Sequence, residues 1–294
     1  MRESPPRSQP LDQADGLRRL FAHAQVRHVP VVSNPHVAFG GVMLERLCTA
    51  FAEHGKHTLV VDASERASAH AEMALLDLSE CIEALSPRVS YLAARGLPLR
   101  FVDAQGSTHS FLRAVSDAAP HADVVLVHAS ASELCRLFTR RGPDTGEAMV
   151  RPVLLADDRP ASVTHAYAAM KLLTQRGGMV VHDLLLGAAS HSPRAERIAI
   201  QLATCGDDFL GAVLRDWAAL DPAADPLQPP EPALRRLVAR MLQAPAQPSS
   251  IGARPDDAPL YVDRPPVNRN HGHGHGHGHS HSHRQSASLS GALN

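Results

Sequence analysis

The stretch VPVVSNPHVAFGGVMLERLCTAFAEHGKHTLVVDAS, from Val29 to Ser64, decides the fold. A β-branched run ends at Val32, and a loop that contains Gly40 and Gly41 follows. An amphipathic helical pattern comes next, and a second β-branched run closes the stretch. A strand, a glycine-containing loop, a helix and a second strand in this order form a βαβ unit, whose two strands run parallel.

The same alternation of short apolar runs and helical patterns continues to about residue 220. It is typical of a parallel sheet with helices on both faces, because strands covered on both faces are apolar nearly throughout. Strands are expected at 29–33, 58–62, 99–103, 123–128, 152–156, 179–185 and 213–217. Helices are expected at 42–54, 69–85, 133–139, 163–175, 192–204 and 231–243. The predicted fold class is therefore α/β, with a doubly wound, mostly parallel sheet.

Composition divides the chain into five parts. Residues 1–10 are polar and proline-rich and are expected to be disordered, and residues 11–24 are expected to form a detached helix. The α/β domain is expected to span 27–220, and a linker with a basic amphipathic helix follows at 221–243. Residues 244–294 are proline-rich and then histidine-rich, with too few apolar groups to offset the entropy of ordering, so they are predicted to be disordered.

The overall charge and the cysteines narrow the functional classes. The chain has 29 Lys and Arg against 30 Asp and Glu, a net charge of -1, so it lacks the basic field that collects nucleic acid. No CxxC pair indicates zinc, and the cysteines are too sparse for a disulfide framework. No apolar run is long enough to cross a membrane, and the N-terminus does not resemble a signal peptide. We expect a cytoplasmic protein, or one that lies on the inner membrane surface. The cysteines are Cys48, Cys81, Cys135 and Cys205.

The stretch from Val29 to Ser64 resembles the opening of the MinD/ParA-type P-loop ATPases. Four later segments are similar to this superfamily in the same order: the strand and glycine turn after the switch region, the Walker B strand, a strand with its proline-containing loop and helix start, and the last strand. They are residues 96–107, 122–132, 151–173 and 207–220. The resemblance implies a MinD-like P-loop fold over roughly residues 29–220.

A short N-terminal segment narrows the resemblance to one branch. LDQADGLRRLF, residues 11–21, matches the DQAxxLR motif of the flagellar number regulators FlhG and FleN. In that branch the segment docks on the SRP-type GTPase FlhF and stimulates GTP hydrolysis, which the resemblance implies here. Other flagellar assembly or regulatory proteins are further expected partners. The alternative is an amphipathic helix that packs on its own domain. The matching residues are Asp12, Gln13, Ala14, Leu17 and Arg18.

The chemistry of this segment is compatible with that role. Asp12 can cap the N-terminus of a helix, and Leu17 lies on a small apolar face. Gln13 would orient a water molecule in the partner's site, as glutamines do in other GTPases.

The phosphate-binding loop departs from its family. Against the family's KGGVGKT, the signature lysine falls on Pro35, the P-loop lysine on Gly40, and the Mg²⁺-binding hydroxyl on Gly41. Two early glycines have become His36 and Val37, and proline has no N–H to donate. ATP and Mg²⁺ binding are therefore expected to be lost, which predicts a pseudo-ATPase without catalytic residues. The alternative is an active ATPase with atypical ligands.

Other nucleotide contacts of the family are also missing. Asp62 remains after the second strand, but the second aspartate of that motif is Ser64. The Walker B aspartate corresponds to His128, and the asparagine that contacts adenine falls on His182 or Asp183.

Three of the replacements are histidines that we expect at carboxyl ends of strands: His36, His128 and His182. Such ends are where α/β sheets bind ligands, so the three could form a metal or acid/base site. The preferred interpretation is that they are unconstrained substitutions in an abandoned pocket.

The segment after the domain has the pattern of a short basic amphipathic helix. Such a helix can lie in an anionic membrane interface, as a C-terminal helix does in MinD and FlhG relatives. The alternative is that its apolar face closes the domain core. The apolar residues are Leu234, Leu237, Val238, Met241 and Leu242, and the basic residues are Arg235, Arg236 and Arg240.

The histidine-rich tail predicts affinity for Ni²⁺, Zn²⁺, Co²⁺ or Cu²⁺, because alternation with Gly and Ser lets several imidazoles converge on one ion. The histidines are His271, His273, His275, His277, His279, His281 and His283. The sequence thus predicts a non-hydrolysing FlhG-like regulator of flagellar number and placement, with a metal-binding protein or metallochaperone on the same fold as the alternative.

Overall fold

The computed structural model describes residues 26–68, 77–104, 107–139, 150–189 and 191–243. The strands are β1 (Arg27–Val32), β2 (Thr58–Asp62), β3 (Glu83–Ser86), β4 (Val89–Ala93), β5 (Val124–Ala129), β6 (Val153–Asp157), β7 (Val181–Gly187) and β8 (Val213–Leu220). The helices are α2 (Gly40–Glu53), α3 (His109–Ala118), α4 (Ala131–Phe138), α5 (Pro160–Gly177), α6 (Pro193–Leu210) and α7 (Pro232–Gln243), with 3₁₀ turns η1 (Leu78–Cys81) and η2 (Leu97–Phe101).

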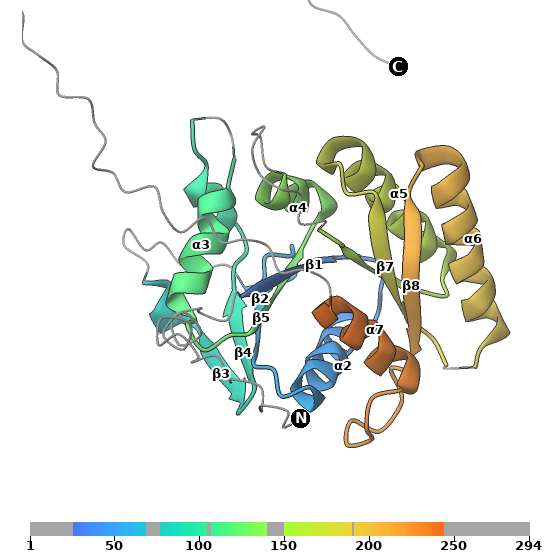
Figure 1. Ribbon diagram of the computed structural model, residues 1–294, viewed down its shortest axis with the longest axis horizontal. Coiled ribbons are helices and arrows are strands. Elements are labelled where there is room, and N and C mark those ends of the chain that lie inside the picture. Colours follow the sequence, from blue (N-terminus) through green and yellow to red (C-terminus); the bar gives the residue numbers. More distant parts are fainter. Residues whose placement is uncertain (1–25, 69–76, 105–106, 140–149, 190, 244–294) are drawn as a thin grey trace, which may run out of the picture. The chain divides into compact units, whose positions relative to one another are not determined.

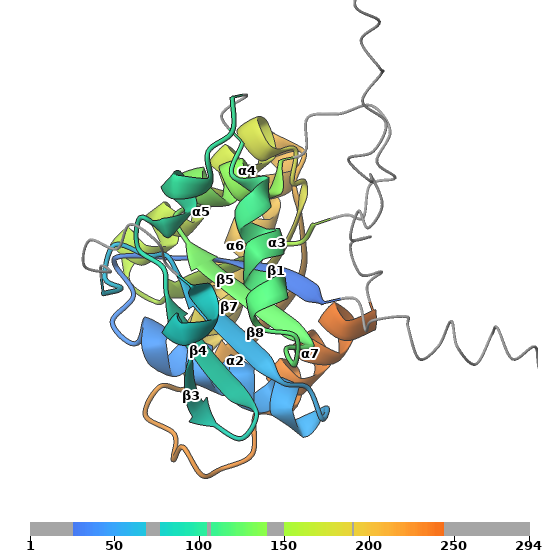
Figure 2. The same cartoon turned by 90° about the vertical axis from the view of Figure 1, so that its left-hand side faces the viewer.

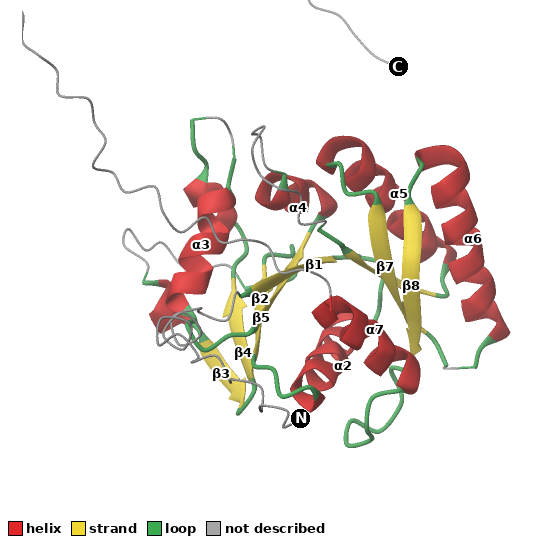
Figure 3. Cartoon of the chain, in the orientation of Figure 1, coloured by secondary structure: helices red, strands yellow, loops and turns green. Residues whose placement is uncertain are grey.

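Within the described residues, the eight strands form one sheet in the order β3-β4-β2-β5-β1-β6-β7-β8 (Figure 3). All neighbouring strands run parallel except β3 and β4, which are antiparallel. The predicted α/β fold class, a doubly wound and mostly parallel sheet, is confirmed.

Helices cover both faces of this sheet (Figures 1 and 2). One apolar core lies under α3, α4, α5 and α6, and includes the fully buried Phe111 and Leu134. A second core lies under α2 and α7, and includes the fully buried Phe51 and Leu237. The central strands therefore have apolar side chains on both faces, which is why they appear in the sequence as nearly unbroken apolar runs.

The loop after β1 lies at the point where the strand order reverses. From β1 the chain crosses to β2 on one side of the sheet, while β6 lies on the other side of β1. Ligands of open α/β sheets bind at such a switch point, beyond the carboxyl ends of the strands. Pro30 is tolerated in this central strand because β1 pairs with β6 only at Val31 and Val32, so its missing N–H leaves that ladder intact.

Two predictions between β2 and α3 are wrong. Residues 99–103 were expected to form a strand, but η2 spans Leu97–Phe101. Gly96 has a φ of 77°, which turns the chain sharply, and Pro98 fits the first turn of a helix, where no N–H is needed. Of the predicted helix at 69–85, residues 69–76 lie outside the described residues, and the rest holds η1 and part of β3.

The outer edge of β8 is occupied by side chains around Trp217. The main-chain N–H of Trp217 donates to Asp216 Oδ1 at 2.9 Å, and its carbonyl accepts from Arg236 of α7 at 3.3 Å. Asp216 also accepts a hydrogen bond from Arg240 Nη1 at 2.8 Å. Helix α7 is thus held to the edge strand by ion pairs as well as by its apolar face.

None of the helices in the described part of the chain combines the length and apolar character needed to span a bilayer.

Candidate functional site

The loop after β1 is tethered by the buried side chain of Asn34. Its Nδ2 donates to the carbonyl oxygens of Leu155, at 2.9 Å, and Ser162, at 3.0 Å. Its Oδ1 accepts from the main-chain N–H of His36 at 3.1 Å, and its own carbonyl accepts from the N–H of Val37 at 3.1 Å. One asparagine therefore fastens the loop to β6 and α5 and uses two of the loop's amide donors.

A carboxylate from the end of β6 takes a third amide donor. Asp157 Oδ2 accepts from the main-chain N–H of Ala38 at 3.3 Å and from Arg159 Nε at 3.0 Å. Burial raises the pKa of Asp157, but the hydrogen bonds from Arg159 and Ala38 and the charge of Arg159 more than offset it, so the pKa lies below its ordinary value. Asp157 is therefore a charged group next to the loop at neutral pH.

Two arginines hold the carbonyl groups of the same loop. Arg66, which follows β2, donates to the carbonyl oxygens of Pro35 and Val37, the latter at 3.3 Å. Arg159, which follows β6, donates to the carbonyl oxygen of His36. The loop and both arginines line a cleft of about 270 Å³.

The residues of this loop do not fit a nucleoside triphosphate with Mg²⁺. An anion-binding loop presents free N–H groups, but the amides of His36, Val37 and Ala38 already donate within the chain, and Pro35 has none. The residue that precedes α2 is Phe39, which is 56% exposed and offers no capping hydrogen bond. Gly40 and Gly41, the first two residues of α2, have no side chain that could contact a phosphate or Mg²⁺.

Asp62 and His128 form a pair at the carboxyl ends of β2 and β5. His128 Nδ1 lies 2.9 Å from Asp62 Oδ1, and Asp62 also accepts from the N–H of Ser64 at 3.0 Å and from the Tyr91 hydroxyl at 3.3 Å. Burial raises the pKa of Asp62, but the hydrogen bonds from His128 and Ser64 bring it below its ordinary value. Burial and the charge of Asp62 raise the pKa of Tyr91 to about 12. The group therefore joins three neighbouring strands.

The three histidines do not gather at one place. The exposed His36 meets His165 of α5 edge-on, with ring centroids 5.8 Å apart, and burial together with the charge of His36 lowers the pKa of His165. His182 is fully buried at the start of β7, the opposite end of the strand from the switch point, and its Nε2 lies 3.1 Å from Thr174 Oγ1. The expectation that His182 and Asp183 lie at the carboxyl end of their strand is wrong. β7 runs from Val181 to Gly187, so both residues lie near its start.

Helix α7 buries the face that the sequence offered for a membrane. Arg235 pairs with Glu53 of α2 at 2.9 Å, and Arg236 and Arg240 pair with Asp216 at 3.3 and 2.8 Å. Of the two alternatives left open for this helix, the structure shows the one that closes the core. The buried side chains are Leu234, Leu237, Val238 and Met241, and Leu242 is half-buried.

Two predicted groups lie outside the described residues: the DQAxxLR segment with Asp12 and Gln13, and the histidines 271–283. Conversely, sequence reasoning did not find Asn34, Asp157 or the two arginines. The acidic pair at the end of β6 was a signal for Asp157, because polar residues at carboxyl ends of parallel strands gather at the switch point.

Comparison with solved structures finds chains that follow a similar course. They include MinD cell division protein of Aquifex aeolicus, with 11% identity, a TM-score of 0.48, and coverage of 74% of this chain and 97% of that one. Cobyrinic acid a,c-diamide synthase of Mycobacterium smegmatis with bound ADP and magnesium has 12% identity, a TM-score of 0.49, and coverage of 77% and 100%. A plasmid partition protein of Borrelia burgdorferi has 8% identity, a TM-score of 0.49, and coverage of 74% and 100%. No protein-family model and no curated protein sequence matches the chain. The likeness concerns the fold alone.

Proposed function

We propose that this protein is a non-hydrolysing, FlhG-like regulator of bacterial flagellar number and placement, which acts by binding a partner. The observation that carries the proposal is the use of the loop's amide donors by Asn34 and Asp157. A loop whose donors are satisfied by the chain itself does not need a nucleotide to order it. The α/β domain then serves as a fixed scaffold instead of an ATP-driven switch.

The proposed output is the segment 11–21, which precedes the domain and carries the DQAxxLR motif. Its partner would be an FlhF-like SRP-type GTPase, with Gln13 orienting the attacking water and Arg18 meeting acidic surface near the phosphates. Other flagellar assembly proteins are further proposed partners. The proposed location is the cytoplasm. Attachment to the inner membrane surface is proposed as the alternative, and it requires α7 to detach from the domain core.

The test mixes the purified full-length protein with FlhF and GTP and follows phosphate release. We expect the protein to accelerate hydrolysis equally with and without ATP. Gln13→Ala should abolish the acceleration, whereas the matched variant Gln9→Ala, outside the motif, should retain it. Unchanged hydrolysis on addition of the wild-type protein would remove the proposal, and acceleration that requires ATP would remove its non-hydrolysing part.

A second candidate function rests on the seven alternating histidines between His271 and His283. A metal-storage or metal-delivery protein would bind several divalent ions there, because clustered imidazoles suit Ni²⁺, Zn²⁺, Co²⁺ and Cu²⁺. Deletion of residues 271–283 should then impair growth or enzyme maturation under metal limitation. If the deletion changes neither, while Gln13→Ala alters flagellation, the metal candidate is excluded and the regulator is supported.

A further inference from the structure

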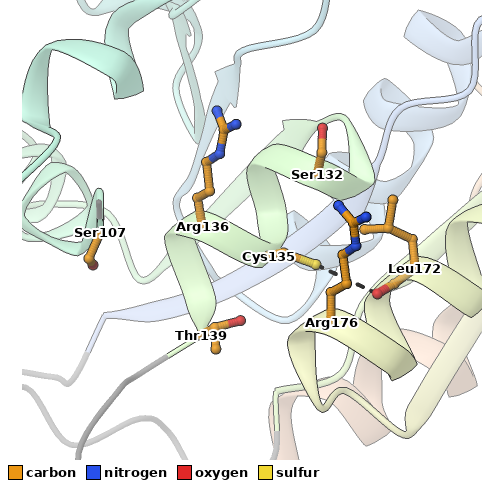
Figure 4. Close-up of a pocket in the computed structure, with 7 residues that line it drawn as sticks. All are labelled: Ser107, Ser132, Cys135, Arg136, Thr139, Leu172 and Arg176. Carbon is orange, nitrogen blue, oxygen red and sulfur yellow. Dashed lines mark hydrogen bonds between the residues drawn. The ribbon is translucent and has the colours of Figure 1, made fainter. Parts of the chain in front are cut away.

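A second cleft lies between α4 and α5, away from the loop after β1 (Figure 4). The volume of this cleft is about 260 Å³. Helix α4 contributes Ser132, Cys135 and Arg136, which recur at i, i+3 and i+4 and so share one helical face, and Thr139 follows at i+7. Helix α5 faces them with Arg176 and, one turn earlier, Leu172. The cleft is thus built by matching faces of two packed helices.

The cleft is positively charged. Arg136 and Arg176 are both exposed, and neither has an ion-pair partner among the residues that the structure describes. In Figure 4 their side chains lie on either side of α4, with Ser132 and Cys135 between them. Glu133, the acidic residue of this helix, is not among the residues that line the cleft, and its carboxylate accepts from the Ser130 hydroxyl at 3.2 Å.

Two of the uncharged residues that line the cleft bear on what it can bind. The Thr139 hydroxyl is buried and makes no hydrogen bond to any residue that the structure describes, so it is a donor without an acceptor there. The Cys135 thiol lies 3.9 Å from the carbonyl oxygen of Leu172. Burial raises the pKa of Cys135 in spite of the nearby charge of Arg176, so the thiol is neutral and does not repel an anion.

We propose that this cleft binds the phosphate group of a small phosphorylated molecule. Guanidinium groups match phosphate oxygens with paired N–H donors. Arg136 and Arg176 both line the cleft, and neither has an ion-pair partner among the described residues, so an anion with several oxygens would satisfy them best. The Thr139 hydroxyl supplies a further donor inside the cleft. At about 260 Å³ the cleft falls below the usual size of pockets for drug-sized ligands, which favours a compact phosphorylated molecule over an extended peptide. The site does not depend on the proposed partner binding.

Cysteine protection tests both binding and place. The full-length protein is treated with iodoacetamide, with and without millimolar pyrophosphate, and the alkylation rate of each cysteine is read by peptide mass spectrometry. We expect pyrophosphate to slow alkylation of Cys135 severalfold and to leave the half-buried Cys81 and Cys205 unchanged. Equal slowing at all three would show a general effect and overturn the proposal.

Substitutions test whether Arg136 and Arg176 bind the anion. Arg136→Gln combined with Arg176→Gln should abolish the protection by pyrophosphate, and Thr139→Val should weaken it. Arg197→Gln, an exposed arginine on α6, is the matched control and should leave the protection intact. Calorimetry with pyrophosphate gives the second measurement: heat in the wild type that disappears in the double variant supports the site.

Three further outcomes would overturn the proposal. One is protection that persists in the double variant. Another is the absence of both heat and protection with pyrophosphate. The third is protection of Cys135 by a tetraglutamate peptide but not by pyrophosphate, because that result would assign the cleft to an acidic segment of a protein partner.

Discussion

The main-chain amide of Ala38 donates a hydrogen bond to the Asp157 carboxylate across 3.3 Å, which joins the loop after β1 to the end of β6. In an anion-binding loop such an amide faces a phosphate oxygen. Here a carboxylate of the chain itself takes that role, and Arg159 balances its charge. The loop is therefore ordered by its own fold.

Asp157→Asn is expected to lower the free energy of unfolding by about 1–3 kcal/mol at pH 7, because it weakens charged hydrogen bonds in a buried setting. Urea unfolding measures the loss. Asp158→Asn is the matched control, since Asp158 is about half exposed and its pair with Arg194 spans 3.5 Å. Equal stability of wild type and Asp157→Asn at pH 7 would contradict the role given to Asp157.

The same variant predicts a pH dependence. The pKa of Asp157 is lowered in the folded state from an ordinary value of 3.8, so its stabilising contribution is present above pH 3.8 and is lost as the pH falls through the folded pKa. Wild type and Asp157→Asn should therefore become equally stable in acid. A difference in stability that stays constant down to acid pH would argue against an ionic contribution.

Gly40→Lys combined with Gly41→Thr should fail to restore ATP binding. The two substitutions return the lysine and hydroxyl of a P-loop, and both side chains have room, since an added Cβ at Gly40 meets nothing nearer than Val37 Cγ1 at 3.9 Å and one at Gly41 meets nothing within 4 Å. The amide donors, however, remain engaged by Asn34 and Asp157. Calorimetry with Mg²⁺-ATP is the measurement, and thermal unfolding shows that the variant folds. Micromolar binding, by this variant or by the wild type, would revive the active ATPase.

Asp183→Asn is expected to stabilise the protein at neutral pH. Asp183 is 1% exposed, and its Oδ1 makes no hydrogen bond within the described part of the chain. Burial is the main reason that its pKa is raised to about 6, and the charge of Asp216 adds to it, although Arg151, Arg215 and Arg240 act in the opposite direction. Because the folded pKa is raised, the ionised form costs stability above about pH 6, on the order of 2–3 kcal/mol.

Urea unfolding at pH 7.5 and 5 checks this prediction. The gain from Asp183→Asn should be largest at pH 7.5 and should shrink at pH 5. His182 acts in the opposite sense. Burial lowers its pKa to about 4, so the stability that the neutral, buried ring contributes is lost as the pH falls below 6.5. The variant should therefore lose stability more steeply on acidification than the wild type. The exposed Asp208→Asn is the control, and a variant less stable than wild type at pH 7.5 would contradict the prediction.

Asp216→Asn is expected to loosen α7, because it removes both ion pairs to Arg236 and Arg240 without altering the helix itself. We expect lower stability and a larger fraction of protein that floats with phosphatidylglycerol vesicles, since the freed helix is basic and amphipathic. Flotation in a density gradient is the measurement. Asp208→Asn should behave as the wild type does. If wild type and Asp216→Asn float to the same extent, docking of α7 does not control access to the membrane.

The central part of the fold could be predicted from sequence because its strands are buried on both faces. β1, β2, β5 and β6 each contain a short apolar run, and a helix follows β1, β5 and β6. The region between β2 and α3 could not be predicted in this way. The residues of β3 are all exposed, so they give no apolar signal, and an apolar stretch around Pro98 forms a 3₁₀ turn because of its backbone geometry.

The sequence predicted which side chains the candidate site lacks, but not which hydrogen bonds hold its loop in place. The absence of a lysine from the loop at 33–41 is a matter of residue identity, and a sequence shows it directly. The bonds that Asn34 makes to Leu155 and Ser162 reach 121 and 128 residues along the chain, and no local pattern reports them. The same holds for Arg66, which follows β2 yet binds the carbonyls of Pro35 and Val37.

The main-chain groups of Trp217 have a wider consequence. An edge strand with free N–H and C=O groups is a template on which a second molecule can extend the sheet and start an aggregate. Asp216 and Arg236 occupy these groups, and Arg236 belongs to α7. Helix α7 thus covers a hydrogen-bond acceptor of the edge strand, and an event that detaches it would free the Trp217 carbonyl to pair with a second molecule.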